Sequence, residues 1–223
     1  MSSREIKAVI FDLDGTLLDT LEDLAAAVNY ALKQMGYPER TIEEVRRFVG
    51  NGVAKLMKRA VPVGTTKEDM EKTLLSFKEY YTAHSKDRTR LYEGVEKMLL
   101  RLQKNGIKMA IVSNKLHPAV QILRDTYFSG IIEVAIGEQE DKGVRKKPAP
   151  DTVLQALSLL SCTKEEAVYV GDSDVDIETA KNCGMPCVSV TWGFRSREFL
   201  ISHGATEIID NPEDIFPYLE IRK

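Results

Sequence analysis

Short, continuous apolar runs recur along the chain and are separated by segments with a helical pattern. The first run covers residues 6–11 and ends in acidic residues and a glycine. Runs of the same kind follow at residues 107–112, 134–136, 167–170, 187–190 and, more weakly, 208–209. A short apolar run that ends in polar residues is typical of a parallel strand buried on both faces. We therefore predict six parallel strands.

Helices are predicted between these strands. Apolar residues recur at helical spacing over residues 95–102, before Asn105-Gly106, a pair that commonly ends a helix. We expect Asp151 to cap a helix that continues to residue 160, and a further helix over residues 176–183. Strands that alternate with helices predict an α/β fold with a doubly wound parallel sheet, which binds ligands at the carboxyl ends of its strands.

One long segment, from about residue 21 to residue 85, contains no predicted strand. Apolar residues from Leu24 to Met35 share one face of a helix, and residues 70–81 form a second helical stretch. A helical insert therefore follows the first strand directly. We predict two domains, which are a Rossmann-like core of residues 1–17 and 89–223 and a helical cap of residues 18–88.

Charged and small polar residues follow several of the predicted strands immediately. The carboxyl ends of parallel strands meet at the same edge of a sheet, so these residues should share one crevice. They are Asp12-Leu13-Asp14-Gly15-Thr16 after the first strand, Ser113-Asn114 after the second, Gly171-Asp172-Ser173-Asp174-Val175-Asp176 after the fourth, and the basic loop Lys146-Lys147-Pro148-Ala149-Pro150 between them.

Carboxylates crowded into one pocket cannot all stay ionised without a cation to offset them. Asp12, Asp14, Asp172 and Asp176 would be crowded in this way, and Mg²⁺ is the divalent cation that such oxygen ligands suit best. Together with Lys147, these groups would hold a phosphate-like substrate. A carboxylate there can attack phosphorus, while a second carboxyl group two residues away moves the proton.

Composition narrows the classes of partner. The 31 basic and 34 acidic residues give a net charge of −3, so no basic excess favours nucleic acid. The sequence shows no apolar stretch long enough to span a membrane. Its three cysteines are expected to be free thiols of a reducing compartment. We expect a cytoplasmic protein, a monomer or small homo-oligomer, that acts on a small phosphorylated substrate.

Four segments in order resemble the motifs of the haloacid dehalogenase superfamily. Residues 12–20 match the pattern D-x-D-G-T-L-x-D-[ST], and the other segments are Ser113-Asn114, Lys147-Pro148 and Gly171-Asp172-Ser173 followed by Asp176. The resemblance covers the whole predicted core, from Ile6 to about Trp192. The insert between the first and second motifs looks like the helical cap of that superfamily.

The resemblance implies a role for each matching residue. Asp12 would be the nucleophile, and Asp14 the general acid and base that also lends its backbone carbonyl to Mg²⁺. Asp172 would ligate the metal, and Asp176 would support it. Asp14 at this position argues against dehalogenases and transport ATPases, and favours phosphoryl transfer. The residues that would bind the phosphoryl group or the substrate are Gly15, Thr16, Asn51, Ser113, Asn114 and Lys147.

Within the superfamily, residues 48–53, 112–115 and 190–193 look like the phosphoglycolate phosphatase group. This likeness implies a phosphatase for a small phosphomonoester such as 2-phosphoglycolate. A phosphomutase of the β-phosphoglucomutase kind, a pyrophosphatase and a non-catalytic binding module remain alternatives. The Gly50-Asn51-Gly52 turn is either a substrate-reading loop, in which Asn51 reads a carboxylate, or a plain connection between helices.

Two further expectations concern lysines and motion. Lys115 is either a phosphate contact or an exposed residue at a helix start, whereas Lys146 is expected on the surface. The cap is expected to close over the substrate by flexing near residues 16–20 and 85–91, which would exclude water from the attack.

Overall fold

Six parallel strands form the central sheet of this protein. The computed structural model describes residues 6–220. The order of the strands across the sheet is β5 (Val134–Glu138), β4 (Lys108–Leu116), β1 (Ala8–Phe11), β6 (Ala167–Gly171), β7 (Cys187–Val190) and β8 (Glu207–Ile209). Every neighbouring pair is parallel. Each strand coincides with one of the six apolar runs, so the prediction of the sheet is confirmed.

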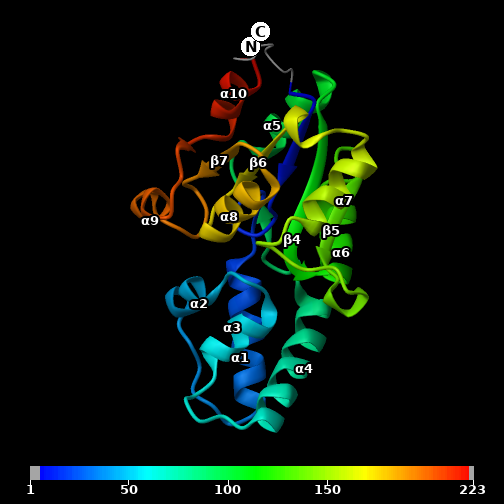
Figure 1. Cartoon of the computed structure of the whole chain (residues 1–223). Helices are drawn as coiled ribbons and strands as arrows, with labels where there is room; N and C mark the ends of the chain where they lie inside the picture. Colours follow the sequence, from blue (N-terminus) through cyan, green and yellow to red (C-terminus); the bar gives the residue numbers. More distant parts are fainter. Residues whose placement is uncertain (1–5, 221–223) are drawn as a thin grey trace.

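Helices cover both faces of the sheet, as Figure 1 shows. Successive side chains of a strand point to opposite faces. Val9 and Phe11 pack with α5 (Val95–Lys104) and α6 (His117–Tyr127), whereas Ile10 packs on the other face. That second face is covered by α7 (Asp151–Leu160) and α8 (Asp174–Cys183). The remaining elements of the core are α9 (Arg197–Ser202), α10 (Phe216–Glu220) and the 3₁₀ turns η1 (Glu140–Lys142), η2 (Lys164–Glu166) and η3 (Pro212–Ile215).

Two helix starts differ from the prediction. Asp151 is the first residue of α7 and does not cap it, because its carboxylate accepts hydrogen bonds from Arg145 at 2.8 and 3.0 Å. Helix α8 begins at Asp174, two residues earlier than expected. Ser173 and Asp176 form a capping box there, in which Ser173 N donates to the Asp176 carboxylate at 3.1 Å and starts the helix.

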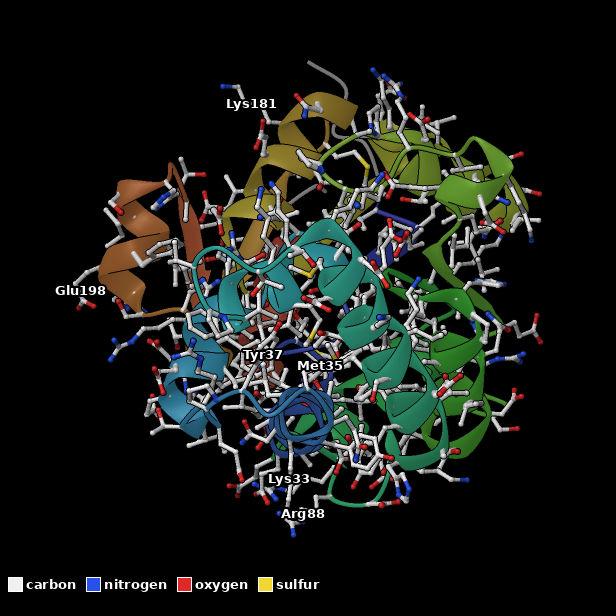
Figure 2. All side chains as sticks on the ribbon, turned by 90° about the horizontal axis from the view of Figure 1, so that it is seen from below. Lys33, Met35, Tyr37, Arg88, Lys181 and Glu198 are labelled. Carbon is white, nitrogen blue, oxygen red and sulfur yellow. The ribbon has the colours of Figure 1, made fainter. Side chains whose placement is uncertain are left out.

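The insert folds into four helices that lie together below the sheet in Figure 1. These are α1 (Leu21–Gln34), α2 (Ile42–Phe48), α3 (Val53–Ala60) and α4 (Lys67–His84). They bury an apolar cluster of their own, which includes Val28, Met57 and Phe77. The periodicity predicted α1 and α4 but extended α1 to Met35, which caps the helix instead. In Figure 2 α1 is seen end-on, with the side chains of Met35 and Tyr37 near its end.

The two chain segments that join the insert to the core pair with each other. Leu18 lies opposite Leu91 and Asp19 opposite Arg90 in a short antiparallel ribbon, formed by β2 (Leu18–Asp19) and β3 (Arg90–Leu91). Strands of two residues leave no periodic pattern, so the sequence did not predict them. Both segments lie where the cap was expected to flex. The domain boundaries at residues 18 and 88 remain a prediction.

Asp23 of α1 joins these connections to the insert. Its carboxylate, only 3% exposed, accepts hydrogen bonds from the Arg88 and Thr89 backbone N–H groups and from the Thr89 hydroxyl, at 2.8 to 3.1 Å.

The three cysteines are free thiols, as expected. Within residues 6–220, no helix combines the length and apolar character that crossing a membrane requires.

Asp23→Ala is expected to lower the free energy of unfolding by about 2–4 kcal/mol, because it leaves the buried Thr89 N–H and the part-buried Arg88 N–H without their acceptor. Urea unfolding followed by circular dichroism measures the change. Glu22→Ala is the matched control, since Glu22 forms only exposed ion pairs that stabilise by less than about 1 kcal/mol. Equal losses in the two variants would contradict this role for Asp23.

Candidate active site

Three carboxylates from two strand ends come together in a buried cluster. Asp12 follows β1, Asp172 follows β6, and Asp176 lies in the first turn of α8. Each offers one oxygen, and the three oxygens lie within 4.8 Å of one another. All three side chains are buried, so little water screens their repulsion. The cluster is therefore a candidate site for a metal ion.

Electrostatics in the cluster opposes full ionisation. Burial raises the pKa of Asp12 to about 7, the Asp176 carboxylate adds to the rise, and the Lys147 ammonium opposes it. Burial also raises the pKa of Asp172 well above its ordinary value, and the carboxylates of Asp176 and Asp12 contribute. A bound cation would relieve both effects, because it favours the ionised form of each carboxylate. Hard oxygen ligands of this kind suit a divalent ion such as Mg²⁺.

The Lys147 ammonium places one positive charge against the three carboxylates. Its ammonium lies 2.8 Å from an oxygen of Asp12, 2.8 Å from an oxygen of Asp176 and 3.0 Å from the Tyr169 hydroxyl. Burial acts to lower the pKa of Lys147, but the two carboxylates outweigh burial and hold it well above its ordinary value. This ammonium contacts two of the three carboxylates, so ionisation of all three would leave the buried cluster with an excess of negative charge.

The Asp14 side chain lies outside this cluster. Its Oδ1 accepts hydrogen bonds from the Thr20 hydroxyl at 2.6 Å and from the Lys115 ammonium at 2.6 Å. Asp14 still lines the same cavity as Asp12, in which Ser113 also lies. The two aspartates of the first motif thus face one space but have different partners, and only Asp12 joins the acidic cluster.

The sequence left two alternatives for Lys115, and the structure contradicts one of them, the exposed helix start. The phosphate contact stays a prediction, because Lys115 lines the cavity. It is 5% exposed in β4, not in an exposed helix start, and its ammonium contacts Asp14 and the hydroxyl of Tyr81 in α4. Burial acts to lower its pKa, but Asp14 and Tyr81 outweigh burial and raise it. No sequence signal could identify Tyr81 as a partner, because it lies in the insert.

The loop residues of the first motif support the site from outside the cavity. Gly15 has a φ of +87°, and a Cβ there would collide with the Asp172 carboxylate, so the loop requires glycine. The buried Thr16 hydroxyl has no hydrogen-bond partner among residues 6–220. The Thr16 carbonyl accepts from the Trp192 indole at 3.0 Å. Neither Gly15 nor Thr16 is among the residues that line the cavity.

The second motif contributes to the cavity wall and to the position of Lys147. Ser113 and Asn114 both line the cavity. The Asn114 amide donates to the Lys147 carbonyl at 2.9 Å, and its own side-chain oxygen is buried without a partner among the described residues. The Ser113 hydroxyl accepts from the Lys115 backbone N–H at 3.2 Å. Asn114 therefore fixes the loop that presents Lys147.

The insert supplies the opposite wall of the cavity. The Gly50-Asn51-Gly52 turn, which connects α2 to α3, lines the cavity. Apolar side chains of the neighbouring helices, such as Leu24 and Leu56, line it as well. Asn51 has a φ of 63°, an uncommon conformation for a residue other than glycine. The structure thus brings Asn51 to the same cavity as Asp12. The volume of this cavity is about 80 Å³.

Other residues of the sequence analysis lie elsewhere. Lys146, expected on the surface, is half-buried: it pairs with Glu140 at 2.6 Å and its side chain lies beside Gly52 of the turn, although it does not line the cavity. Several residues of the wall had not been expected, and two of them belong to one core segment. Phe194 and Arg195 follow β7 and line the cavity beside the turn of the insert.

Known proteins share this sequence and this fold. The haloacid dehalogenase-like hydrolase family matches residues 9–190. Phosphoglycolate phosphatase 1 of Pseudomonas aeruginosa is 35% identical over 97% of this chain and 80% of its own. Phosphoglycolate phosphatase of Aquifex aeolicus is 33% identical over 85% of this chain and 86% of its own.

Solved structures give the same result. A crystal structure from Lactobacillus delbrueckii subsp. bulgaricus, of a protein with a proposed phosphoglycolate phosphatase activity, has a TM-score of 0.90 and 37% identity. The similarity covers 96% of this chain and 98% of that one. The match to the family spans all four motifs, and the overall fold agrees with that of the solved structure. The chain therefore belongs to the haloacid dehalogenase-like hydrolase family.

Proposed function

We propose that this protein is a phosphatase that forms an aspartyl phosphate on Asp12. The observation that carries this proposal is the placement of Asp12, whose Oδ1 is held by Lys147 at 2.8 Å and which lines a cavity together with Ser113 and Asp14. A buried carboxylate, an ammonium and a hydroxyl that face one small space form a site for a phosphoryl group. Family membership and the named relatives support the same activity.

Mg²⁺ is the proposed cofactor. Asp12 and Asp172 would hold it, with the Asp14 backbone carbonyl, and Asp176 would support it while it orients Lys147 at 2.8 Å. The residues fit this role, because the three carboxylates are buried together, Lys147 pairs with only two of them, and a bound cation would allow all three to ionise. When bound, the ion supplies charge neutralisation between the Asp12 carboxylate and the oxygens of the phosphoryl group.

The residues of the chain account for each bond change. A carboxylate oxygen of Asp12 attacks phosphorus and forms a new P–O bond, while the bond to the ester oxygen breaks. Lys147 and the Ser113 hydroxyl would bind the phosphoryl oxygens. Asp14 would give its proton to the leaving alkoxide. Water would then attack phosphorus, Asp14 would take the proton from that water, and phosphate and the free Asp12 carboxylate would result.

The partners of Asp14 suit this proton transfer. Both of its hydrogen bonds, from Thr20 and Lys115, go to Oδ1. Among the described residues, no donor occupies Oδ2, so that oxygen can face the leaving group. The two donors would hold the carboxyl group in one orientation, which general acid catalysis requires.

The proposed substrate is a small phosphomonoester, with 2-phosphoglycolate as the best candidate. The cavity of about 80 Å³ has room for several water molecules, each of which needs about 10–15 Å³, and this size favours a compact substrate. Asn51, on the wall that faces Asp12, is the proposed reader of the substrate carboxylate. The relatives named phosphoglycolate phosphatase support this substrate.

Divalent metal is expected to stabilise the fold. At a Mg²⁺ concentration of 100 times the dissociation constant, the stabilisation is about 2.7 kcal/mol, which corresponds to roughly 5–10 °C in Tm for a chain of this size. Asp172→Asn should abolish this response. Without metal, the same variant should melt close to the wild type, because burial and the neighbouring carboxylates already favour the uncharged form of Asp172. Differential scanning fluorimetry with and without Mg²⁺ measures both melting temperatures. An unchanged response to Mg²⁺ in Asp172→Asn would exclude Asp172 as a metal ligand.

Asp12→Asn is expected to reduce phosphate release by at least about 10⁴-fold, because it removes the nucleophile. Release is measured with and without Mg²⁺ from 2-phosphoglycolate, pyrophosphate, several sugar phosphates and an aryl phosphate. Asp174→Asn is the control, since Asp174 is a carboxylate of the same helix that does not line the cavity. Substantial turnover by Asp12→Asn would overturn the assignment, and isomerised sugar phosphate in place of free phosphate would indicate a mutase.

Asp14→Asn is expected to separate the two chemical steps. With an alkyl phosphate, turnover should fall by about 10²–10⁴-fold, because the leaving alkoxide is no longer protonated. A nitrophenyl phosphate, whose leaving group needs no proton, should still release one equivalent of nitrophenol in a burst, after which the aspartyl phosphate accumulates. Stopped-flow absorbance detects the burst. Equal losses with both substrates and no burst would contradict this role of Asp14.

A further inference from the structure

The segment that follows β7 lies against both walls of the cavity. A Cβ on Gly193 would collide with the Gly15 carbonyl and the Asp172 side chain, so the chain passes directly against the acidic cluster there. The next residue, Phe194, donates its backbone N–H to the Asp172 carboxylate at 2.6 Å. Its ring packs into the apolar cluster of the insert. One short segment of the core thus contacts both the acidic cluster and the insert.

Arg195 extends this contact to the end of α2. Its guanidinium donates to the Arg46 carbonyl at 3.0 Å and to the Val49 carbonyl at 2.6 Å. The last carbonyls of a helix have no partner within the helix, and a cation near them is favourable. Val49 immediately precedes the Gly50-Asn51-Gly52 turn. Arg195 therefore satisfies the carbonyls that lead into the turn facing Asp12.

A second arginine holds the same turn from within the insert. Arg59 of α3 donates to the Phe48 carbonyl at 2.6 Å and to the Gly50 carbonyl at 3.4 Å. These bonds would persist if the insert moved as a unit, because both partners belong to it. The bonds of Arg195 cross from the core to the insert and would break. Arg195 is thus placed to fix where the turn lies relative to the cavity.

We propose that Arg195 is a positioning residue that seats the Gly50-Asn51-Gly52 turn over the cavity and thereby sets the affinity for the part of the substrate beyond the phosphoryl group. The proposal rests on the proposed phosphatase function. The phosphoryl group itself is bound by core residues, whereas the remainder of the substrate faces the turn. If the seated position is populated less, the apparent dissociation constant rises in inverse proportion to the seated fraction.

The test compares Arg195→Met with Arg197→Met. Arg197 lies two residues further along and pairs with Asp210 of the core, so the same substitution there leaves the insert untouched. Arg195→Met is expected to raise KM for 2-phosphoglycolate about tenfold, which corresponds to about 1.4 kcal/mol. The inhibition constant of inorganic phosphate should change by less than about twofold, because phosphate contacts the core alone. Arg195→Lys, which keeps one donor group, should recover part of the loss.

Hydrogen exchange supplies a readout that does not depend on activity. The amides of residues 46–53 should exchange faster in Arg195→Met than in the wild type or Arg197→Met, while the amides of α4 stay unchanged. Equal exchange at residues 46–53 in all three proteins would overturn the proposal. An equal rise of KM and of the inhibition constant of phosphate would also overturn it, because the effect would then lie in the phosphoryl site. A wild type that releases no phosphate would refute the proposed function, and exchange would still decide the role of Arg195.

Discussion

The site depends on a buried imbalance of charge at the ends of two strands. Asp12, Asp172 and Asp176 place their oxygens within 4.8 Å of one another, and Lys147 offsets only part of their charge. Such a group is costly to bury without a further cation. The surrounding structure holds it together nevertheless, since Asn114 fixes the loop of Lys147 and Asp176 is anchored by the capping box that starts α8.

The doubly wound sheet makes this concentration of charge feasible. Strands β1 and β6 are hydrogen-bonded neighbours at the centre of the sheet, so the residues that follow them are brought side by side by a rigid scaffold. Apolar layers on both faces stabilise that scaffold. The repulsion among the carboxylates is therefore opposed by packing at a distance from the site, and the free energy that a cation would recover remains available for binding.

The insert completes the cavity and is joined to the chemistry at two points. Lys115 connects Asp14 to Tyr81 of α4, and the segment around Phe194 connects Asp172 to the cluster of the insert. In each connection, one core residue contacts both a proposed catalytic or metal-binding aspartate and the insert. The position of the insert and the state of the charged cluster are therefore expected to influence each other through these contacts.

The sequence by itself determined the six strands, the class of the sheet and the residues at the strand ends, because apolar runs and a local motif are written in consecutive positions. It also indicated the insert. Only the tertiary structure decided that β2 pairs with β3, that Asp151 binds Arg145 instead of capping its helix, and that Lys115 is buried against Tyr81. Arg195 and Val49 are 146 positions apart, and their contact exists only because the insert lies over the sheet. Periodicity reports which face of an element is buried, whereas it carries no information on which distant element covers that face.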